Sequence, residues 1–462
     1  MLRRDPAAQA RLQALQDDVC GLELQLARKR SEMISLTNSL APVSSLPPEV
    51  LAEIFIAGRH ITSPFLPFPL LVSHVHRHWR EVALQSPGLW TNIYIGDHSK
   101  SMALLDLYLK RSRTQPLDVE MTHTRASGFC ENETSDIYIS LFNMLARHAV
   151  RWRSFNFHVD LYSDSNNYQS WFSSFRNLSA PRLESLRLEY DGYADSPVKL
   201  EIFSAGAPLL SSVVLCGDAL PFGFPSPSSV SSLELGPHEE DYWYSELHEV
   251  LVATRTLSKL VLHHHLRLQP LTSSQCPLPF EFPSLRSLEI LPPKITKDPF
   301  RFEDTFNAIE APNLDSLILD IAKDDKLSDL ITAFGDRDLS TRFPRLSTLG
   351  LHLRNVPDDR LPELCDALPT VTRIISTHDN VRGLLNFLDA TKSQPRWLDL
   401  VSVTILNRSY KFNFDLLCAV ISSRLTAGHP IRRLEVPSSI AYEIPMDRLR
   451  WLREHVELRY CM

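Results

Sequence analysis

The sequence is poor in glycine, with 14 glycines in 462 residues. This limits the phosphate-binding loops that the chain can form, because such loops use glycine to bring backbone N–H groups close to phosphate. The chain also has no Gly-x-x-x-x-Gly-Lys loop, no Gly-x-Ser-x-Gly turn, no His-Glu-x-x-His and no Cys-x-x-Cys. We therefore expect no enzyme activity, no catalytic residues, no bound metal and no cofactor.

Other absences bear on partners and location. No apolar run approaches the roughly 20 residues of a membrane-spanning helix, and the first residues lack the apolar core of a signal peptide. The net charge of −7 gives no reason to expect binding to nucleic acid or to an anionic membrane. The seven cysteines are scattered and odd in number, which favours free thiols in a reducing compartment. We expect a cytoplasmic or nuclear protein with no membrane and no nucleic-acid partner.

Residues 1–41 predict one long amphipathic helix that ends near Ala41-Pro42, because proline disfavours helix in the residue before it. Its apolar residues alternate spacings of three and four, with Lys29 as the single polar interruption. Two interpretations remain open: a coiled coil that forms a homodimer through residues 12–40, or a helix that folds back onto the body. The seam consists of Leu12, Leu15, Val19, Leu22, Leu26, Lys29, Met33, Leu36 and Leu40.

The segment after this helix carries three spaced motifs. Residues 46–55 read Leu-Pro-Pro-Glu-Val-Leu-Ala-Glu-Ile-Phe, residues 71–80 read Leu-Val-Ser-His-Val-His-Arg-His-Trp-Arg, and residues 86–90 read Ser-Pro-Gly-Leu-Trp. Proline suits the first turn of a helix, and a glutamate there is favoured by the helix dipole. The three motifs together resemble an F-box over residues 44–92, a small helical module that docks on an adaptor protein.

This resemblance implies a function without chemistry. An F-box protein docks on a Skp-type adaptor, and through it on a cullin, within a ubiquitin ligase complex. The resemblance implies that the exposed corner around Leu46 and Pro47 and the flank of the first helix contact the adaptor, whereas Trp79 and Trp90 also serve the core of the module. The full set of expected adaptor-binding residues is Leu46, Pro47, Val50, Leu51, Ile54, Phe55, Val72, Val75, Trp79 and Trp90.

Residues 93–462 carry a recurring unit, x-x-Leu-x-x-Leu-x-Leu, often opened by proline. Its clearest copies are 181–188, 283–290, 312–319 and 344–351, and weaker copies end at Phe157, Leu215, Leu235, Leu262, Leu400 and Val436. Leu-x-Leu places two side chains on one face of a strand. Helical patterns between the copies favour a parallel sheet with helices on its other side. They span 244–255, 302–311, 326–334, 360–367, 381–390 and 414–425.

This pattern resembles the leucine-rich-repeat domains of some F-box proteins. The expected fold class is therefore a long helix and a small helical F-box followed by an irregular leucine-rich-repeat-like α/β solenoid with a parallel sheet. An unknown target protein would bind on the strand face, at residues between the two core leucines such as Arg187, Glu234, Glu289 and Asp399. Loops along the rim of the sheet are the alternative site.

The sequence therefore favours a substrate-recognition subunit of a Skp–cullin–F-box E3 ubiquitin ligase. A scaffold protein that uses its F-box outside a ligase is the alternative, and an undetected hydrolase is a remote one. Two histidine groups are weak candidates for a metal site: His74 with His78, spaced by four residues, and 263–265, where strand alternation would split the side chains between two faces.

Overall fold

The computed structural model describes most of the chain. The described residues are 6–60, 67–96, 101–123, 131–160, 172–191, 200–217, 222–223, 229–236, 242–243, 251, 254–263, 266–267, 279–291, 305–306, 308–321, 330–331, 343–353, 361–376, 381–389, 397–406, 413–441 and 443–461. They divide into two compact units, of which the first contains residues 1–93 and 102–117 and the second contains 94–101 and 118–462.

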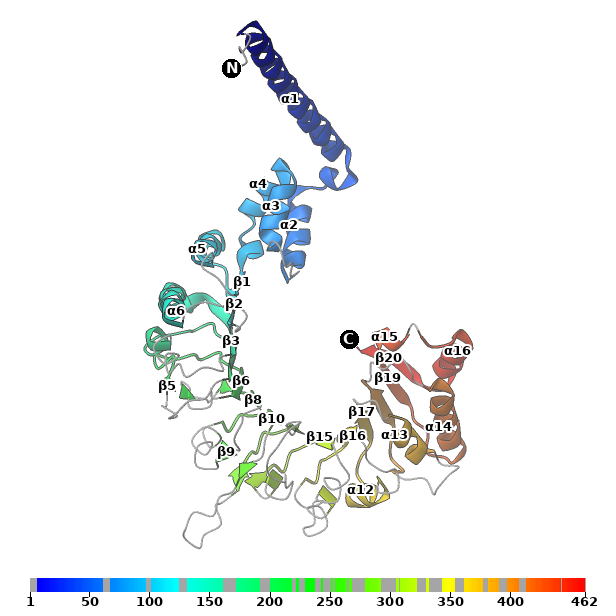
Figure 1. Cartoon of the computed structure of the whole chain (residues 1–462). Coiled ribbons are helices and arrows are strands. Elements are labelled where there is room, and N and C mark those ends of the chain that lie inside the picture. Colours follow the sequence, from blue (N-terminus) through cyan, green and yellow to red (C-terminus); the bar gives the residue numbers. More distant parts are fainter. Residues whose placement is uncertain are drawn as a thin grey trace, which may run out of the picture. The chain divides into compact units, whose positions relative to one another are not determined.

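The first unit is helical (Figure 1). Its long helix confirms the helix expected from the apolar spacing, and its end at Leu40 lies where Pro42 predicted it. The described α1 side chains are exposed apart from Asn38, so α1 does not pack along the other helices of the first unit. The elements are α1 (Pro6–Leu40), η1 (Pro42–Ser45), α2 (Pro48–Ala57), η2 (Gly58–His60), α3 (Phe68–Val75), α4 (Arg77–Gln85), η3 (Pro87–Trp90) and α5 (Ser101–Arg111).

The core of the first unit is built from apolar positions of α2 to α5. Leu51 and Phe55 of α2 are buried, as are Val72 of α3 and Trp90 of η3. The Trp90 indole N–H donates to the Ala83 carbonyl at 2.8 Å, and its ring meets the edge of Tyr108 of α5 at 5.3 Å between centroids. Because α5 belongs to this unit, the compact unit extends beyond the predicted 44–92 module.

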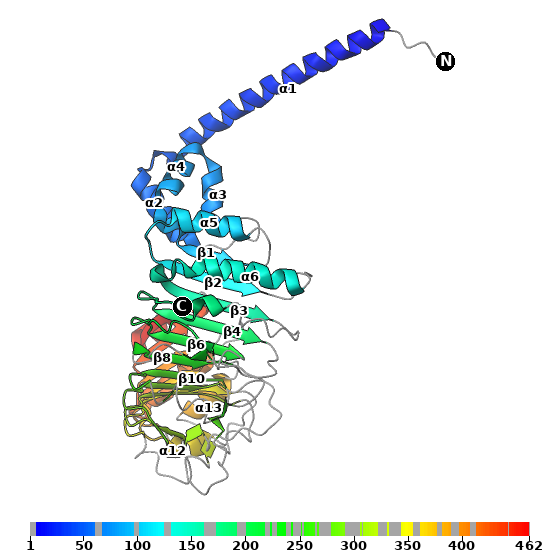
Figure 2. The ribbon, with the colours of Figure 1, turned by 90° about the vertical axis from the view of Figure 1, so that its left-hand side faces the viewer.

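Fourteen of the described strands form one large sheet, most of which lies in the second unit. Its order is β1-β2-β3-β4-β6-β8-β10-β13-β15-β16-β17-β18-β19-β20, and every neighbouring pair from β3 onward is parallel. Figure 2 shows β3, β4, β6, β8 and β10 side by side. The predicted parallel sheet is confirmed. The strands are β1 (Asn92–Ile95), β2 (Leu117–His123), β3 (Trp152–Asp160), β4 (Ser185–Asp191), β6 (Ser212–Gly217), β8 (Ser232–Leu235), β10 (Lys259–Leu262), β13 (Ser287–Ile290), β15 (Ser316–Ile321), β16 (Thr348–Leu353), β17 (Arg373–Ser376), β18 (Ser402–Ile405), β19 (Arg433–Pro437) and β20 (Glu457–Cys461).

Each copy of the sequence unit occupies the same place in this sheet. In the copy that forms β13, Leu285 lies before the strand and Leu288 and Ile290 lie within it, and all three are fully buried. Register pairs Leu288 with Leu260 on one side and with Leu317 on the other. The period-two alternation of a strand therefore sends each Leu-x-Leu pair into the core and leaves the residue between the two on the outer face.

A backbone ladder joins successive copies just before the strands begin. The Ser258 carbonyl accepts hydrogen bonds from the N–H groups of both Arg286 and Ser287, at 2.8 and 2.9 Å. The Arg286 carbonyl in turn accepts from Asp315 and Ser316 at 3.0 and 2.9 Å. This arrangement recurs from Glu184 to Val401, and it satisfies backbone groups that would otherwise be buried without partners.

The described connections between strands include helices towards the two ends of the sheet and short paired strands in its middle. Helices α6, α12, α13 and α14 lie on one side of the strands (Figure 1), and three predicted helices, 360–367, 381–390 and 414–425, are confirmed as α12, α13 and α14. The described helical elements here are α6 (Glu131–Ala146), η5 (Ala149–Arg151), η6 (Ser173–Phe175), α12 (Leu361–Ala367), α13 (Val381–Leu388), α14 (Phe414–Thr426), α15 (Ser438–Ala441) and α16 (Met446–His455).

The predicted helix over 302–311 is wrong at its end, because Ile309 and Glu310 form a strand that pairs with Phe280 and Glu281. Backbone pairing with the preceding copy outweighs the local helical pattern there. Most of the predicted helices 244–255 and 326–334 lies outside the described residues. Three two-stranded parallel sheets occur among these connections: β5 (Leu200–Glu201) with β7 (Phe222–Gly223), β9 (Tyr242–Trp243) with β11 (Leu266–Arg267), and β12 (Phe280–Glu281) with β14 (Ile309–Glu310).

Candidate interaction surfaces

Helices α2 and α3 each present exposed apolar side chains. Val50 and Ile54 of α2 are 43% and 48% exposed, and Leu71 and Val75 of α3 are 42% and 47% exposed. Each pair is spaced by four residues, so its members lie above one another on one face of their helix. Two large apolar side chains exposed on one face of a short helix are typical of a protein-binding surface.

Four of the ten predicted adaptor-binding residues do not lie on a surface. Leu51, Phe55, Val72 and Trp90 are at most 2% exposed, so none of them can touch a partner directly in this structure. Their interpretation as contact residues is corrected: one face of α2 carries Leu51 and Phe55 into the core. The neighbouring face carries Val50 and Ile54 outward, because consecutive residues differ by about 100° around a helix.

The other predicted positions are accessible. Pro47 is exposed and caps the start of α2, with Pro48 in the first helical position. Leu46 is half-buried. Trp79 is also half-buried, and its ring lies 5.1 Å from that of Phe55. The residues that the structure leaves available for a partner are therefore Leu46, Pro47, Val50, Ile54, Val75 and Trp79, with Leu71 as an addition that the sequence did not single out.

Among the described residues, neither histidine group belongs to a cluster that could hold a metal ion. His74 and His78 lie on different helices, because α3 ends at Val75 and α4 begins at Arg77. Between them, the His76 ring accepts a hydrogen bond from the His78 backbone N–H at 3.3 Å and so caps α4. His263 pairs with Glu234, while 264–265 lie outside the described residues. Within the described ranges, no three His, Cys, Asp or Glu side chains are arranged to hold a metal ion.

The outer face of the sheet carries the three charged residues predicted to bind a target. Register connects Arg187 through Val214 to Glu234, and Glu234 through Val261 to Glu289, so they lie in one row across β4 to β13. Asp399 does not belong to this row. It lies in the turn before β18, because the copy there runs from the buried Leu400 to Val403 and Ile405, and does not end at Leu400 as the sequence predicted.

Each of the three charged residues already has a partner on the same face. Glu289 pairs with Lys259 of the neighbouring strand at 2.7 Å, and Glu234 lies 3.2 Å from the His263 ring. The hydrogen bond with His263 is the main cause that lowers the pKa of Glu234. Arg187 pairs with Glu189 two residues along its own strand. The row therefore consists of charges that are already paired on the outer face.

Glu189 lies in a small cluster with a histidine and a cysteine, the residue types that some hydrolases use for catalysis. Its carboxylate lies 2.8 Å from His158 Nδ1 and accepts from the Cys216 thiol at 3.7 Å. Burial, together with the Glu189 charge, raises the pKa of Cys216 to about 12, so the thiol stays protonated at neutral pH. Since the thiolate is the reactive form, Cys216 lacks the activation that a cysteine nucleophile needs.

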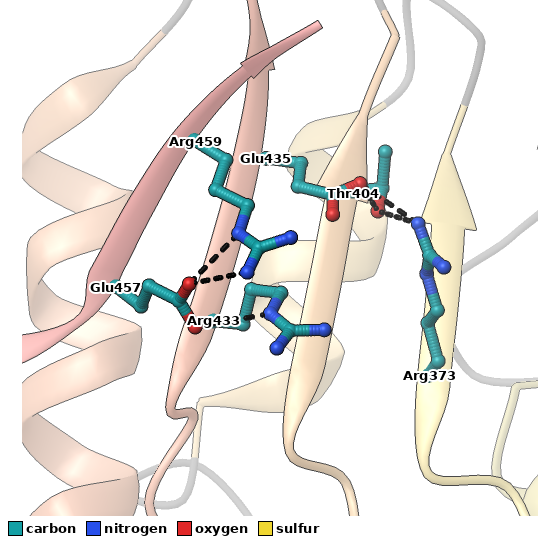
Figure 3. Close-up of polar contacts among 6 residues, drawn as sticks. All are labelled: Arg373, Thr404, Arg433, Glu435, Glu457 and Arg459. Atoms are coloured by element: carbon teal, nitrogen blue, oxygen red, sulfur yellow. Dashed lines mark hydrogen bonds and ion pairs between the residues drawn. The ribbon is translucent and has the colours of Figure 1, made fainter.

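A second polar cluster lies on the last four strands, and the sequence analysis missed it. Arg373 of β17 donates to Thr404 of β18 at 3.2 Å and to Glu435 of β19 at 2.7 Å, and Thr404 donates to Glu435 at 3.0 Å (Figure 3). The alternation in Arg-Leu-Glu-Val at 433–436 and in Glu-Leu-Arg-Tyr at 457–460 is the signal that would have revealed these outward positions.

The same cluster continues to the edge strand. Glu457 of β20 accepts from Arg459 at 2.8 Å and from Arg433 of β19 at 3.2 Å (Figure 3). These two guanidinium groups lower the pKa of Glu457. The cluster contains three arginines and two glutamates, so it carries a net positive charge.

Comparison with known proteins adds no relative: no family model matches the chain, and no curated protein matches it. Among the helices in the described part of the chain, none is long and apolar enough to cross a membrane. The candidate surfaces therefore rest on their own geometry.

Proposed function

We propose that this chain is the substrate-recognition subunit of a Skp–cullin–F-box ubiquitin ligase. In this proposal the helical unit is an F-box that docks on a Skp-type adaptor, and the sheet captures a target protein. The chain contributes no chemistry of its own, since holding the target near the ubiquitin-loading end of the complex raises its effective concentration there.

One observation carries the adaptor-binding part of the proposal. Val50 and Ile54 are exposed on a helix whose other apolar pair, Leu51 and Phe55, is buried in the core. Interfaces depend on a few large anchors, each of which costs about 2 kcal/mol or more when it is removed. The exposed pair, together with Pro47 at the helix start, supplies such anchors at the place where the F-box motif puts them.

The second unit fits an irregular leucine-rich-repeat-like solenoid. The support is the identical placement of successive copies: one buried residue before each strand, two buried residues within it, and the backbone ladder that joins each copy to the next. Such units bury their apolar faces only against their neighbours and leave a continuous outer face for binding. The proposed target surface is this face, with the paired charges of Arg187, Glu234 and Glu289.

The adaptor part is tested with Val50→Asp combined with Ile54→Asp. We expect this variant to lose adaptor binding in a pull-down while it keeps the thermal stability of the wild type, because both side chains are already exposed. Glu49→Gln with Glu53→Gln is the matched control on the same helix and should retain binding. Full adaptor binding by the Val50→Asp, Ile54→Asp variant would contradict the assignment.

Co-purification of the cullin separates a ligase subunit from a scaffold that uses the adaptor alone. The comparison is between the intact chain and one that lacks residues 44–92, under proteasome inhibition. The deletion should abolish co-purification of the adaptor and the cullin, whereas target proteins should still co-purify.

The target surface is tested by exchanging an ion pair. Lys259→Glu with Glu289→Lys keeps the attraction between the two strands but inverts the charges that a target meets. We expect weaker target capture with an unchanged fold. Unchanged capture by this variant, combined with loss on changing the loops after the strands, would move the site to the rim of the sheet.

A further inference from the structure

Strand β20 lies at one end of the large sheet, and β19 is its single partner among the described strands. The Glu457 N–H donates to the Arg432 carbonyl at 2.8 Å, so Glu457 directs its backbone groups towards β19. The backbone groups of successive residues in a strand point to opposite edges. Those of Leu458 and Tyr460 therefore point away from β19, to the side that we call the open edge of β20.

The charges of β20 restrict which strand could pair with the open edge. A row of backbone N–H and C=O groups is a template for another strand, and charged side chains on such an edge keep unmatched strands away. Glu457 and Arg459 have opposite signs and both lie on the outer face, where Arg459 donates to Glu457 at 2.8 Å (Figure 3). The edge therefore favours a strand that carries the same two charges in the reverse order.

A second copy of β20, running in the opposite direction, is such a strand. We propose that two copies of this chain associate edge to edge through antiparallel β20 strands, related by a two-fold axis at Leu458. Glu457 of each copy then meets Arg459 of the other on the outer face. Tyr460 meets Val456 on the opposite face, where Leu458 meets its own copy. This proposal does not rest on adaptor binding.

The backbone groups fit the same register. The two Leu458 residues face each other and exchange a pair of hydrogen bonds, as directly opposed residues do in an antiparallel ladder. The Val456 carbonyl shares a planar peptide group with the Glu457 N–H, so it points to the open edge and can accept from the Tyr460 N–H of the other copy. The Val456 N–H already donates to the Leu452 carbonyl at 2.9 Å and is not needed for the pairing.

Charge separates this register from the two nearest ones that keep the same faces together. Pairing Leu458 with Tyr460 sets Arg459 against its own copy, and pairing Leu458 with Val456 sets Glu457 against its own copy. Like charges directly opposite each other are destabilising. In the proposed register every directly opposed charged pair is attractive, and the like charges lie only on the diagonals, which are longer.

The first experiment measures the mass of the intact chain at micromolar concentration by light scattering. We expect the mass of two chains for the wild type and of one chain for Leu458→Pro, because proline removes an N–H that points to the open edge and none that pairs with β19. Leu458→Val is the matched control: it keeps this N–H and an apolar side chain, so it should keep the two-chain mass. A one-chain wild type would overturn the proposal. A two-chain mass for Leu458→Pro would also overturn it, since the contact would then lie elsewhere, such as along α1.

The second experiment tests the register through charge and leaves every backbone donor in place. Glu457→Arg alone and Arg459→Glu alone should each have the mass of one chain, because each variant sets like charges directly opposite each other in both pairs. An equimolar mixture of the two variants should recover the two-chain mass, since each chain then meets the opposite charge on the other. A two-chain mass for either variant alone, or a one-chain mass for the mixture, would refute the register.

Discussion

Close approach between neighbouring strands determines which side chains fit at single positions of the sheet. Gly236 follows β8, and a Cβ atom placed there would lie 2.0 Å from Cys216 Sγ and 2.8 Å from Cys216 Cβ. We expect Gly236→Ala to lower the free energy of unfolding by about 1–3 kcal/mol, because adding atoms to a packed site forces its neighbours apart. Urea unfolding measures this loss.

The control is Gly21→Ala on the exposed face of α1, where nothing lies within 4 Å of the added atom. Alanine is favoured over glycine within a helix by about 1 kcal/mol, so this variant should be neutral or slightly more helical. Equal stability of Gly236→Ala and the wild type would show that Cys216 does not approach Gly236 as closely as the structure places it.

Cys216 also gives the protein a dependence on alkaline pH. Burial, with the charge of Glu189, raises the pKa of its thiol from 9.0 to about 12, whereas the unfolded chain releases the proton near its ordinary pKa. The contribution of the protonated Cys216 thiol to the unfolding free energy is therefore complete below pH 9, and it is lost as the pH rises through 12. Cys216→Ala should flatten the decline of unfolding free energy in this window. Tyr108, whose pKa burial raises to about 12, contributes equally in both proteins.

At the scale of elements, the strand register separates core from outer face one residue at a time. Leu288 of β13 is fully buried between Leu260 and Leu317, whereas Glu289 points outward to Lys259. Leu288→Asp should cost several kcal/mol, because it buries a carboxylate without a partner. Glu289→Ala should cost about 1 kcal/mol or less, since it removes a partly exposed ion pair. Thermal unfolding compares the two, and equal melting temperatures would refute the register.

At the scale of the whole molecule, α1 is separable from the stability of the rest. Deletion of residues 1–41 removes a helix whose described side chains are nearly all exposed. We expect the deletion to lower the helical circular dichroism signal while changing the unfolding free energy of the remaining chain by about 0.5 kcal/mol or less, as exposed positions usually do. A large drop in melting temperature would show that α1 packs against the body.

The pattern of apolar residues predicts much of this architecture. The spacing in α1 and the helix-breaking proline after it define a helix whose bounds agree with the structure to within one residue at its end. The Leu-x-x-Leu-x-Leu copies define which strand residues enter the core, because a period of two leaves no other arrangement that buries both leucines. The helix predicted over 302–311 failed where pairing with a neighbouring copy outweighed local preference.

The sequence by itself therefore determined the long helix, the alternation of core and outer residues in strands such as β13, and the helices α12 to α14, because each depends on residues close along the chain. Only the tertiary structure decided that Leu51 and Phe55 are buried while Val50 and Ile54 are exposed, since four apolar residues in two turns of one helix look alike until another helix covers one face. It also decided the pairing of Arg373 with Glu435, because this contact joins residues 62 positions apart and depends on how separate strands align.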